Sequence, residues 1–89
     1  MGEEMLAELR EKIDVIDKDI LELILKRLEL VDRVADVKKA TGVPVFVPGR
    51  EDEILDRLVS GVDSKYASYV RDLFTNILNV SKRYQIEKN

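Results

Sequence analysis

The sequence predicts an all-α protein of three helices, of which one is very long, one short and one of medium length. Apolar residues recur at helical spacing over three stretches, at about residues 3–40, 50–60 and 64–86. A loop at about residues 41–49 contains both prolines of the chain and separates the first two stretches. With 89 residues, 45% of them apolar and 37% charged, the chain is expected to form one domain over residues 1–89 with a single small core.

The first stretch carries one continuous apolar stripe, spaced three or four residues apart over most of its length. The residues of the stripe are Leu6, Leu9, Ile13, Ile16, Ile20, Leu23, Leu30, Val34 and Val37. A helix of this length would extend roughly 55 Å, whereas a compact domain of this size has a radius of gyration of about 13 Å. A single copy would leave much of the stripe in water, so we expect a dimer in which the long helices pack on each other.

Two cations, Arg27 and Lys38, fall within this stripe rather than on the polar face of the helix. The positions three and four residues from Arg27 on either side are all apolar, namely Leu23, Ile24, Leu30 and Val31. No acid within a turn can therefore neutralise Arg27, and its partner must come from another helix, a second chain or a ligand.

The two shorter helices also carry polar residues on their apolar faces. Arg50 begins the second helix, and Glu51 follows it on the apolar side, in a first turn where the helix dipole favours an acid. Ser81 and Gln85 lie within the apolar stripe of the third helix. Taken singly, each has an ordinary explanation as a first-turn acid or as a residue of a fraying helix end.

If the three helices pack together, these polar residues share one interior, with Arg10 at the edge of the long stripe. Such a cavity is rich in cations and has one carboxylate and one amide, which suits a small dianion that carries a hydroxyl or an ether. The alternative is a buried salt bridge between Arg27 or Lys38 and Glu51 that only fixes the register of the helices. The pattern of residues leaves both interpretations open.

The composition excludes several other classes of function. The chain has no cysteine and no histidine, so disulfides, thiolate chemistry, imidazole bases and the usual zinc sites are excluded. A net charge of −3 without a basic cluster argues against nucleic acid as a partner. No apolar run approaches the ~18 residues of a membrane span, and the acidic start MGEEMLAEL is unlike a secretory signal, so a cytoplasmic location is expected.

Taken together, these residues resemble the all-helical class of chorismate mutases. The resemblance extends from Leu6 to Gln85 and includes the family's length and three-helix pattern. It rests on LREKID with Arg10, ILKRLELV with Arg27, Lys38 before a proline-containing loop, the pair Arg50-Glu51, and Ser81-x-x-x-Gln85.

The resemblance implies an intertwined homodimer with two equivalent sites, each built mostly from one chain and completed by Arg10 of the other. Arg10 and Arg27 would hold the two carboxylates of the substrate chorismate. Ser81 would assist them, and Arg50 would support the carboxylate end of the site.

By the same resemblance, Lys38 and Gln85 would donate hydrogen bonds to the ether oxygen of the breaking bond, and Glu51 would accept one from the ring hydroxyl. With Arg27 these are the implied catalytic residues. Val47 is a departure, since it stands where the family usually has an aspartate, three residues before the Arg-Glu pair. This substitution is expected to affect substrate affinity more than the type of reaction.

Two other functions remain open. Isochorismate pyruvate-lyases have a similar fold and pattern of cations, although Glu51 favours the mutase because its carboxylate suits the hydroxyl position of chorismate. A helical dimerisation or regulatory module with weak or lost activity is the other alternative. Val47 favours this module, and the intact set of cations argues against it.

Overall fold

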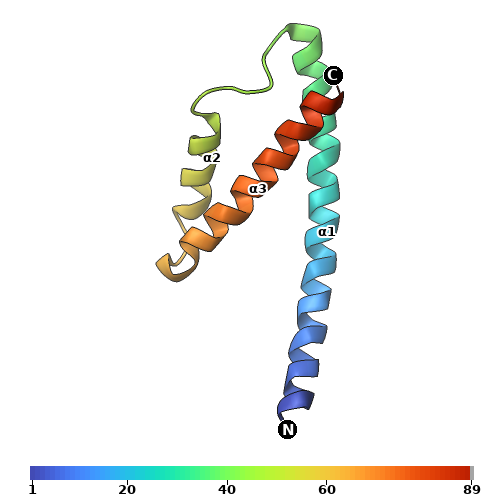
Figure 1. The fold of residues 1–89 in the computed structure, drawn as a ribbon, viewed down its shortest axis with the longest axis vertical. Coiled ribbons are helices and arrows are strands. Elements are labelled where there is room, and N and C mark those ends of the chain that lie inside the picture. The colour runs from blue at the N-terminus through green and yellow to red at the C-terminus, as the bar shows by residue number, and fades with distance from the viewer. Residues whose placement is uncertain (89) are drawn as a thin grey trace. The chain divides into compact units, whose positions relative to one another are not determined.

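The computed structural model describes residues 1–88, which form three α-helices and contain no strand (Figure 1). They are α1 (Gly2–Thr41), α2 (Arg50–Val59) and α3 (Ser64–Lys88). The prediction of an all-helical chain with one very long, one short and one medium helix is confirmed. The chain divides into two compact units, Met1–Leu30 and Val31–Asn89, and each is described separately.

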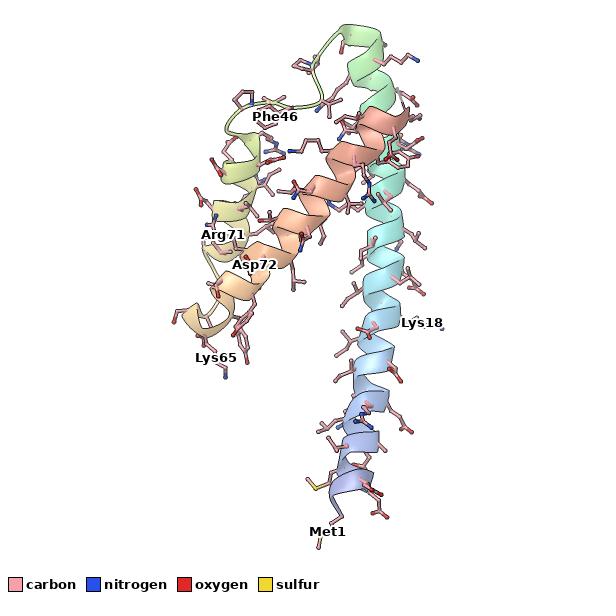
Figure 2. The ribbon with its side chains drawn as sticks, in the orientation of Figure 1. Met1, Lys18, Phe46, Lys65, Arg71 and Asp72 are labelled. Carbon is pink, nitrogen blue, oxygen red and sulfur yellow. The ribbon has the colours of Figure 1, made fainter. Side chains whose placement is uncertain are left out.

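The unit Met1–Leu30 is a stretch of α1 whose apolar stripe is largely exposed. Glu3 and Glu4 lie in its first turn, where the helix dipole favours negative charge. Ile13 is 54% exposed and Leu23 is 64% exposed, which is high for residues on the apolar face of a helix. Polar residues such as Lys18 also extend from this stretch (Figure 2).

The unit Val31–Asn89 has a small core to which all three helices contribute. The buried apolar residues are Val31 and Ala35 of α1, Leu55 of α2 and Leu78 of α3. Two polar residues of α3, Ser81 and Gln85, are also buried and keep only 6% and 8% of their surface exposed. This small core therefore includes polar side chains, and buried polar groups normally have hydrogen-bond partners.

The helix ends follow from local backbone chemistry. α1 ends where Gly42 adopts a φ of 77° and donates its N–H to the Lys38 carbonyl at 2.9 Å, a common way to end a helix. Gly49 has a φ of 81° and directly precedes α2. Asp63 caps α3, since its Oδ1 accepts a hydrogen bond from the Lys65 N–H at 2.9 Å.

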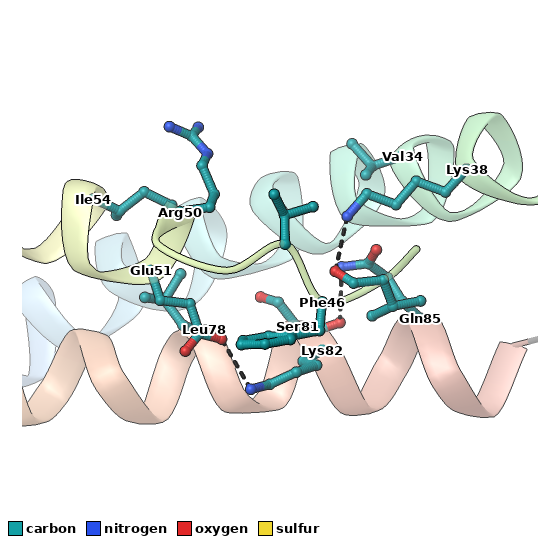
Figure 3. Close-up of a pocket in the computed structure, with 12 residues that line it drawn as sticks. Val34, Lys38, Phe46, Arg50, Glu51, Ile54, Leu78, Ser81, Lys82 and Gln85 are labelled. Atoms are coloured by element: carbon teal, nitrogen blue, oxygen red, sulfur yellow. Dashed lines mark hydrogen bonds and ion pairs between the residues drawn. The ribbon is translucent and has the colours of Figure 1, made fainter. Parts of the chain in front are cut away.

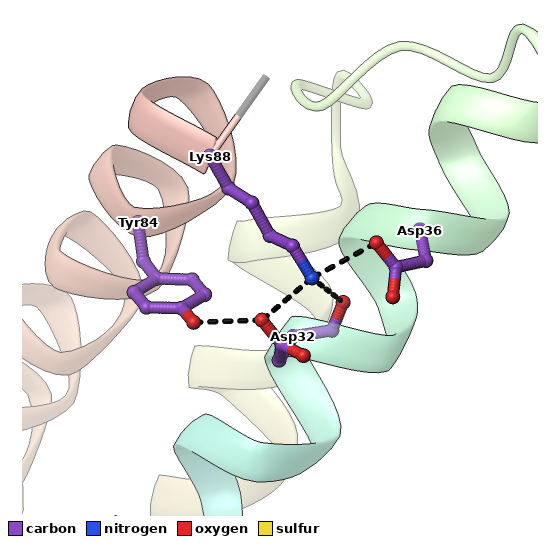
Figure 4. A network of polar contacts seen from close by, with 4 residues as sticks. All are labelled: Asp32, Asp36, Tyr84 and Lys88. Carbon is purple, nitrogen blue, oxygen red and sulfur yellow. Dashed lines mark hydrogen bonds and ion pairs between the residues drawn. The ribbon is translucent and has the colours of Figure 1, made fainter.

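α3 continues to Lys88, two residues beyond the predicted end, because its last residues have partners on α1. We call Asp32, Asp36, Tyr84 and Lys88 the terminal network (Figure 4). The Lys88 Nζ lies 2.7 Å from Asp32 Oδ1 and 2.8 Å from Asp36 Oδ1. The Tyr84 hydroxyl donates to Asp32 Oδ1 at 2.7 Å.

The terminal network shifts the pKa values of its members. Hydrogen bonds from Lys88 and Tyr84 lower the pKa of Asp32. The hydrogen bond to Asp32 raises the pKa of Tyr84, and the hydrogen bonds to Asp32 and Asp36 raise the pKa of Lys88. All these shifts favour the protonation states that tie the end of α3 to α1 at neutral pH.

Candidate active site

A pocket of about 190 Å³ lies in the unit Val31–Asn89, bordered by the end of α1, the loop, the start of α2 and the second half of α3 (Figure 3). The predicted site residues that line it are Lys38, Arg50, Glu51, Ser81 and Gln85. The other lining residues are Val34, Val45, Phe46, Val47, Ile54, Leu78 and Lys82. The structure therefore brings together polar residues from all three helices, as packing of their apolar faces predicts.

Lys38 reaches the pocket from the last turn of α1 and is partly buried. Its Nζ donates a hydrogen bond to the backbone carbonyl of Val45 at 2.9 Å, so the loop after α1 folds back over this side chain. An ammonium group has three N–H donors, and the contact with Val45 uses one of them. Two donors therefore remain for a ligand.

Glu51 lies in the first turn of α2 and forms an ion pair with Lys82 of α3, at 2.9 Å between Oε1 and Nζ. The Lys82 Nζ also lies 5.2 Å from the centroid of the Phe46 ring, in cation–π geometry. Within the described residues, the ion-pair partner of Glu51 is thus Lys82, whereas Lys38 bonds to the loop. A register-fixing salt bridge between Lys38 and Glu51 is not what the structure forms.

Sequence reasoning missed Lys82. A lysine on an amphipathic helix usually lies in solvent with its stem along the surface, so its presence gives no signal by itself. Two features could have pointed to it: Lys82 follows Ser81 directly, and it lies four residues after Leu78, one turn further along the same helix. Its position in the pocket depends on α2, which supplies Glu51 opposite it.

Gln85 has an unusual balance of hydrogen bonds for a buried amide. Its Nε2 donates to the Ser81 carbonyl at 3.3 Å, which is long. Its Oε1 is buried and has no hydrogen-bond partner among residues 1–88. Exchanging the amide N and O atoms would place Oε1 against the Ser81 carbonyl, and two acceptors repel each other. The orientation with Nε2 toward Ser81 is therefore favoured. Gln85 therefore keeps one acceptor in the pocket without a partner from the described protein residues.

Ser81 and Arg50 also line the pocket, with different exposure. The Ser81 hydroxyl is buried and donates to the Ile77 carbonyl at 2.9 Å, a bond within its own helix. Arg50 is exposed, and its guanidinium extends away from α3 (Figure 3). Val47, where the resemblance expects an acid, lies in the lining as an apolar residue.

Arg10 and Arg27 are not among the residues that line this pocket; both belong to the unit Met1–Leu30. Arg10 is exposed and Arg27 is half-buried. Their assignment to the substrate carboxylates stays a prediction.

The pocket is positively charged, since the lining includes Lys38, Arg50 and Lys82 as cations and Glu51 as an acid. An anionic ligand therefore gains from the charges of the lining. Within residues 1–88, no group of three His, Cys, Asp or Glu side chains is arranged to hold a metal ion. No helix in the described part of the chain is both long and apolar enough to cross a membrane.

The described part of the chain is thus an all-helical fold with a small pocket lined by cations, one acid and one buried amide. The chain belongs to the chorismate mutase type II family, whose model matches residues 9–86. The resemblance found in the sequence is thereby confirmed.

Individual relatives are consistent with this family assignment. A chorismate mutase from Methanocaldococcus jannaschii is 49% identical over 55 residues, which are 62% of this chain and 56% of the relative. A T-protein from Haemophilus influenzae is 36% identical over 75 residues, 84% of this chain and 19% of the relative. A 4-amino-4-deoxychorismate mutase from Streptomyces venezuelae is 36% identical over 52 residues, 58% of this chain and 50% of the relative. The matched part is thus less than two thirds of each relative's length.

Proposed function

We propose that the chain is a chorismate mutase, which rearranges chorismate into prephenate. One observation carries the proposal: in a chain of this family, Lys38 of α1, Glu51 of α2 and Gln85 of α3 line one pocket. Lys38 and Gln85 have the N–H donors that the breaking bond needs, and Glu51 has an acceptor for the ring hydroxyl.

The reaction is unimolecular, because one C–O bond breaks as one C–C bond forms, and it requires no nucleophile or base. The protein has to hold the flexible enolpyruvyl arm over the ring and to stabilise the negative charge that develops on the ether oxygen. Lys38, with two donors beyond its bond to Val45, and the amide N–H of Gln85 would donate to that oxygen. Donors that fit the developing oxyanion better than the neutral ether lower the barrier.

The other polar residues would hold the ends of the substrate. Glu51 would accept a hydrogen bond from the ring hydroxyl. Arg50 and Ser81 would support the carboxylate end together with Arg27, and Arg10 would come from a second chain. No cofactor enters this mechanism.

A homodimer is part of the proposal, and the exposure of the Met1–Leu30 stripe supports it. The exposed apolar residues of that unit include Leu6, Leu9, Ile13, Ile16, Ile20 and Leu23, each 47% exposed or more. Burying such a stripe against a second copy removes a large apolar area from water. The dimer, the shared sites and the cytoplasmic location stay predictions.

Mixed dimers test the sharing of sites. An Arg10→Ala chain combined with an Arg27→Ala chain should regenerate one intact site per heterodimer, because both lesions then fall in one composite pocket. Each variant alone should be inactive. If heterodimers form but recover no activity, Arg10 does not act in the site of the partner.

The loss of chorismate absorbance in the presence of the purified chain tests the activity directly. Isochorismate, assayed in parallel for release of pyruvate, tests the lyase alternative. Turnover of chorismate to prephenate supports the mutase. Turnover of isochorismate alone would favour the lyase, and a folded dimer without either activity would favour the regulatory module.

A further inference from the structure

Lys82 is the charged residue of the pocket to which the proposed mechanism gives no task. Its Nζ lies 2.9 Å from Glu51 Oε1 and 5.2 Å from the centroid of the Phe46 ring (Figure 3). The side chains of Lys82 and Glu51 keep only 30% and 36% of their surface exposed. Contacts from α2 and from the loop therefore hold this ammonium group at the end of the pocket where Glu51 lies.

The charged residues that line the pocket with Glu51 are all cations. Among the described residues that line the pocket, Glu51 is the only acid, while Lys38 and Arg50 are cations besides Lys82. Val47 is apolar at the position where the resemblance expects a second acid. The negative charge of Glu51 is thus already offset by Lys82 before any ligand enters.

A hydroxyl and an ammonium group on a ligand would interact differently with the Glu51–Lys82 ion pair. A hydroxyl can donate to Glu51 while the ion pair with Lys82 persists, because a carboxylate has acceptor sites on both oxygens. An ammonium group in the same place would bring a second cation close to Lys82, at a carboxylate whose charge is already neutralised. A site can reject a competitor through such an unfavourable charge as effectively as it selects a substrate through a favourable contact.

We infer that Lys82 makes this pocket selective for substrates with a ring hydroxyl facing Glu51, against analogues that carry an ammonium group in its place. Lys82 is in this view a specificity-determining residue rather than one that acts on the breaking bond. The inference rests on the proposed function, since it requires the ring substituent of a chorismate-like molecule to reach Glu51.

The test compares kcat/KM for chorismate and for 4-amino-4-deoxychorismate in the parent and in variants of Lys82. The parent should favour chorismate. Lys82→Met, which keeps the length of the side chain and removes its charge, should shift the ratio of the two values by about tenfold toward the amine, the effect of one charge–charge interaction at a partly exposed site. Lys82→Arg keeps the charge and should keep the ratio of the parent.

Lys65→Met is a matched control on the same helix. Lys65 also lies over an aromatic ring, with its Nζ 4.9 Å from the centroid of Tyr66, but it does not line the pocket. This variant should leave the ratio unchanged. Circular dichroism verifies that each variant is folded, and Lys82→Gln replaces Lys82→Met if the methionine variant does not fold.

Three outcomes are informative. An unchanged ratio in folded Lys82→Met overturns the inference while leaving the proposed function intact, and so does a parent that prefers the amine to chorismate. A parent that is folded and dimeric but turns over neither compound refutes the proposed function itself, and the inference with it.

Discussion

In the variant Gln85→Leu, a buried amide with one unsatisfied oxygen is replaced by a hydrocarbon side chain of similar size. Gln85 is 8% exposed, and the hydrogen bond from its side-chain Nε2 to the Ser81 carbonyl measures 3.3 Å. Relieving an unsatisfied buried acceptor gains about 1–3 kcal/mol, while the lost hydrogen bond contributes about 0.5–1.5 kcal/mol. We therefore expect the variant to be more stable than the parent by about 1 kcal/mol, before any gain from the added apolar surface.

The effect on catalysis should have the opposite sign. If Gln85 donates to the ether oxygen, its loss removes about 2.7–4 kcal/mol of transition-state stabilisation, which corresponds to a roughly 10²–10³-fold fall in kcat. The variant should thus unfold at a higher temperature, by about 4–8 °C per kcal/mol for a domain of this size, and turn over chorismate far more slowly. An amide with a purely structural role would instead lower stability when it is removed.

Thermal unfolding and chorismate turnover, measured on the same preparation at equal protein concentration, test both parts. Asn79→Leu is the control, because it makes a similar change at an exposed position of the same helix and should leave kcat unchanged. A Gln85→Leu variant that is destabilised by more than about 1 kcal/mol and retains its kcat would refute this reasoning. The amide would then serve the fold and not the reaction.

Three further predictions concern single groups. Gln85→Glu should gain activity as pH falls toward the pKa of the new carboxyl, because only the protonated acid can donate a hydrogen bond. This pKa is near 4.3, or higher if burial raises it. A pH profile of activity parallel to that of the parent would contradict this prediction. Val47→Asp should lower KM by a few-fold with a smaller change in kcat, as expected for uniform binding, whereas unchanged constants would mean that Glu51 suffices. Because the pKa of Asp32 is lowered in the folded chain, its carboxylate stabilises the fold above its unfolded pKa, near 3.8, and this contribution is lost as pH falls through the folded pKa. Asp32→Asn should therefore be less stable than the parent at pH 7 and should lose less stability on acidification. Urea unfolding at about pH 7 and about pH 3 measures both effects.

The helices were predictable from the sequence because their apolar periodicity is regular and because glycine or proline follows α1 and precedes α2. The same regularity made polar exceptions visible, which is why Lys38, Glu51, Ser81 and Gln85 could be selected before their positions were known. All four line the pocket. A polar residue that interrupts an apolar stripe is recognisable from the sequence alone, so no knowledge of the tertiary structure was needed to select these four.

The partners of these residues could not be predicted in the same way. Glu51 pairs with Lys82 and not with Lys38, because the ion pair depends on where the first turn of α2 meets α3. The Tyr84 hydroxyl bonds to Asp32, which is 52 residues away in the chain. Such contacts join surface-type residues whose spacing carries no periodic signal.

The bond between Lys38 and the Val45 carbonyl has a consequence for the energetics of binding. A free lysine side chain has about 2 kcal/mol of rotamer entropy, which a ligand must overcome if the ammonium group is to point at one atom. With its Nζ already fixed at 2.9 Å from Val45, the side chain loses that freedom when the chain folds. A substrate that meets this preorganised donor does not have to order it, so more of the interaction energy remains for lowering the barrier.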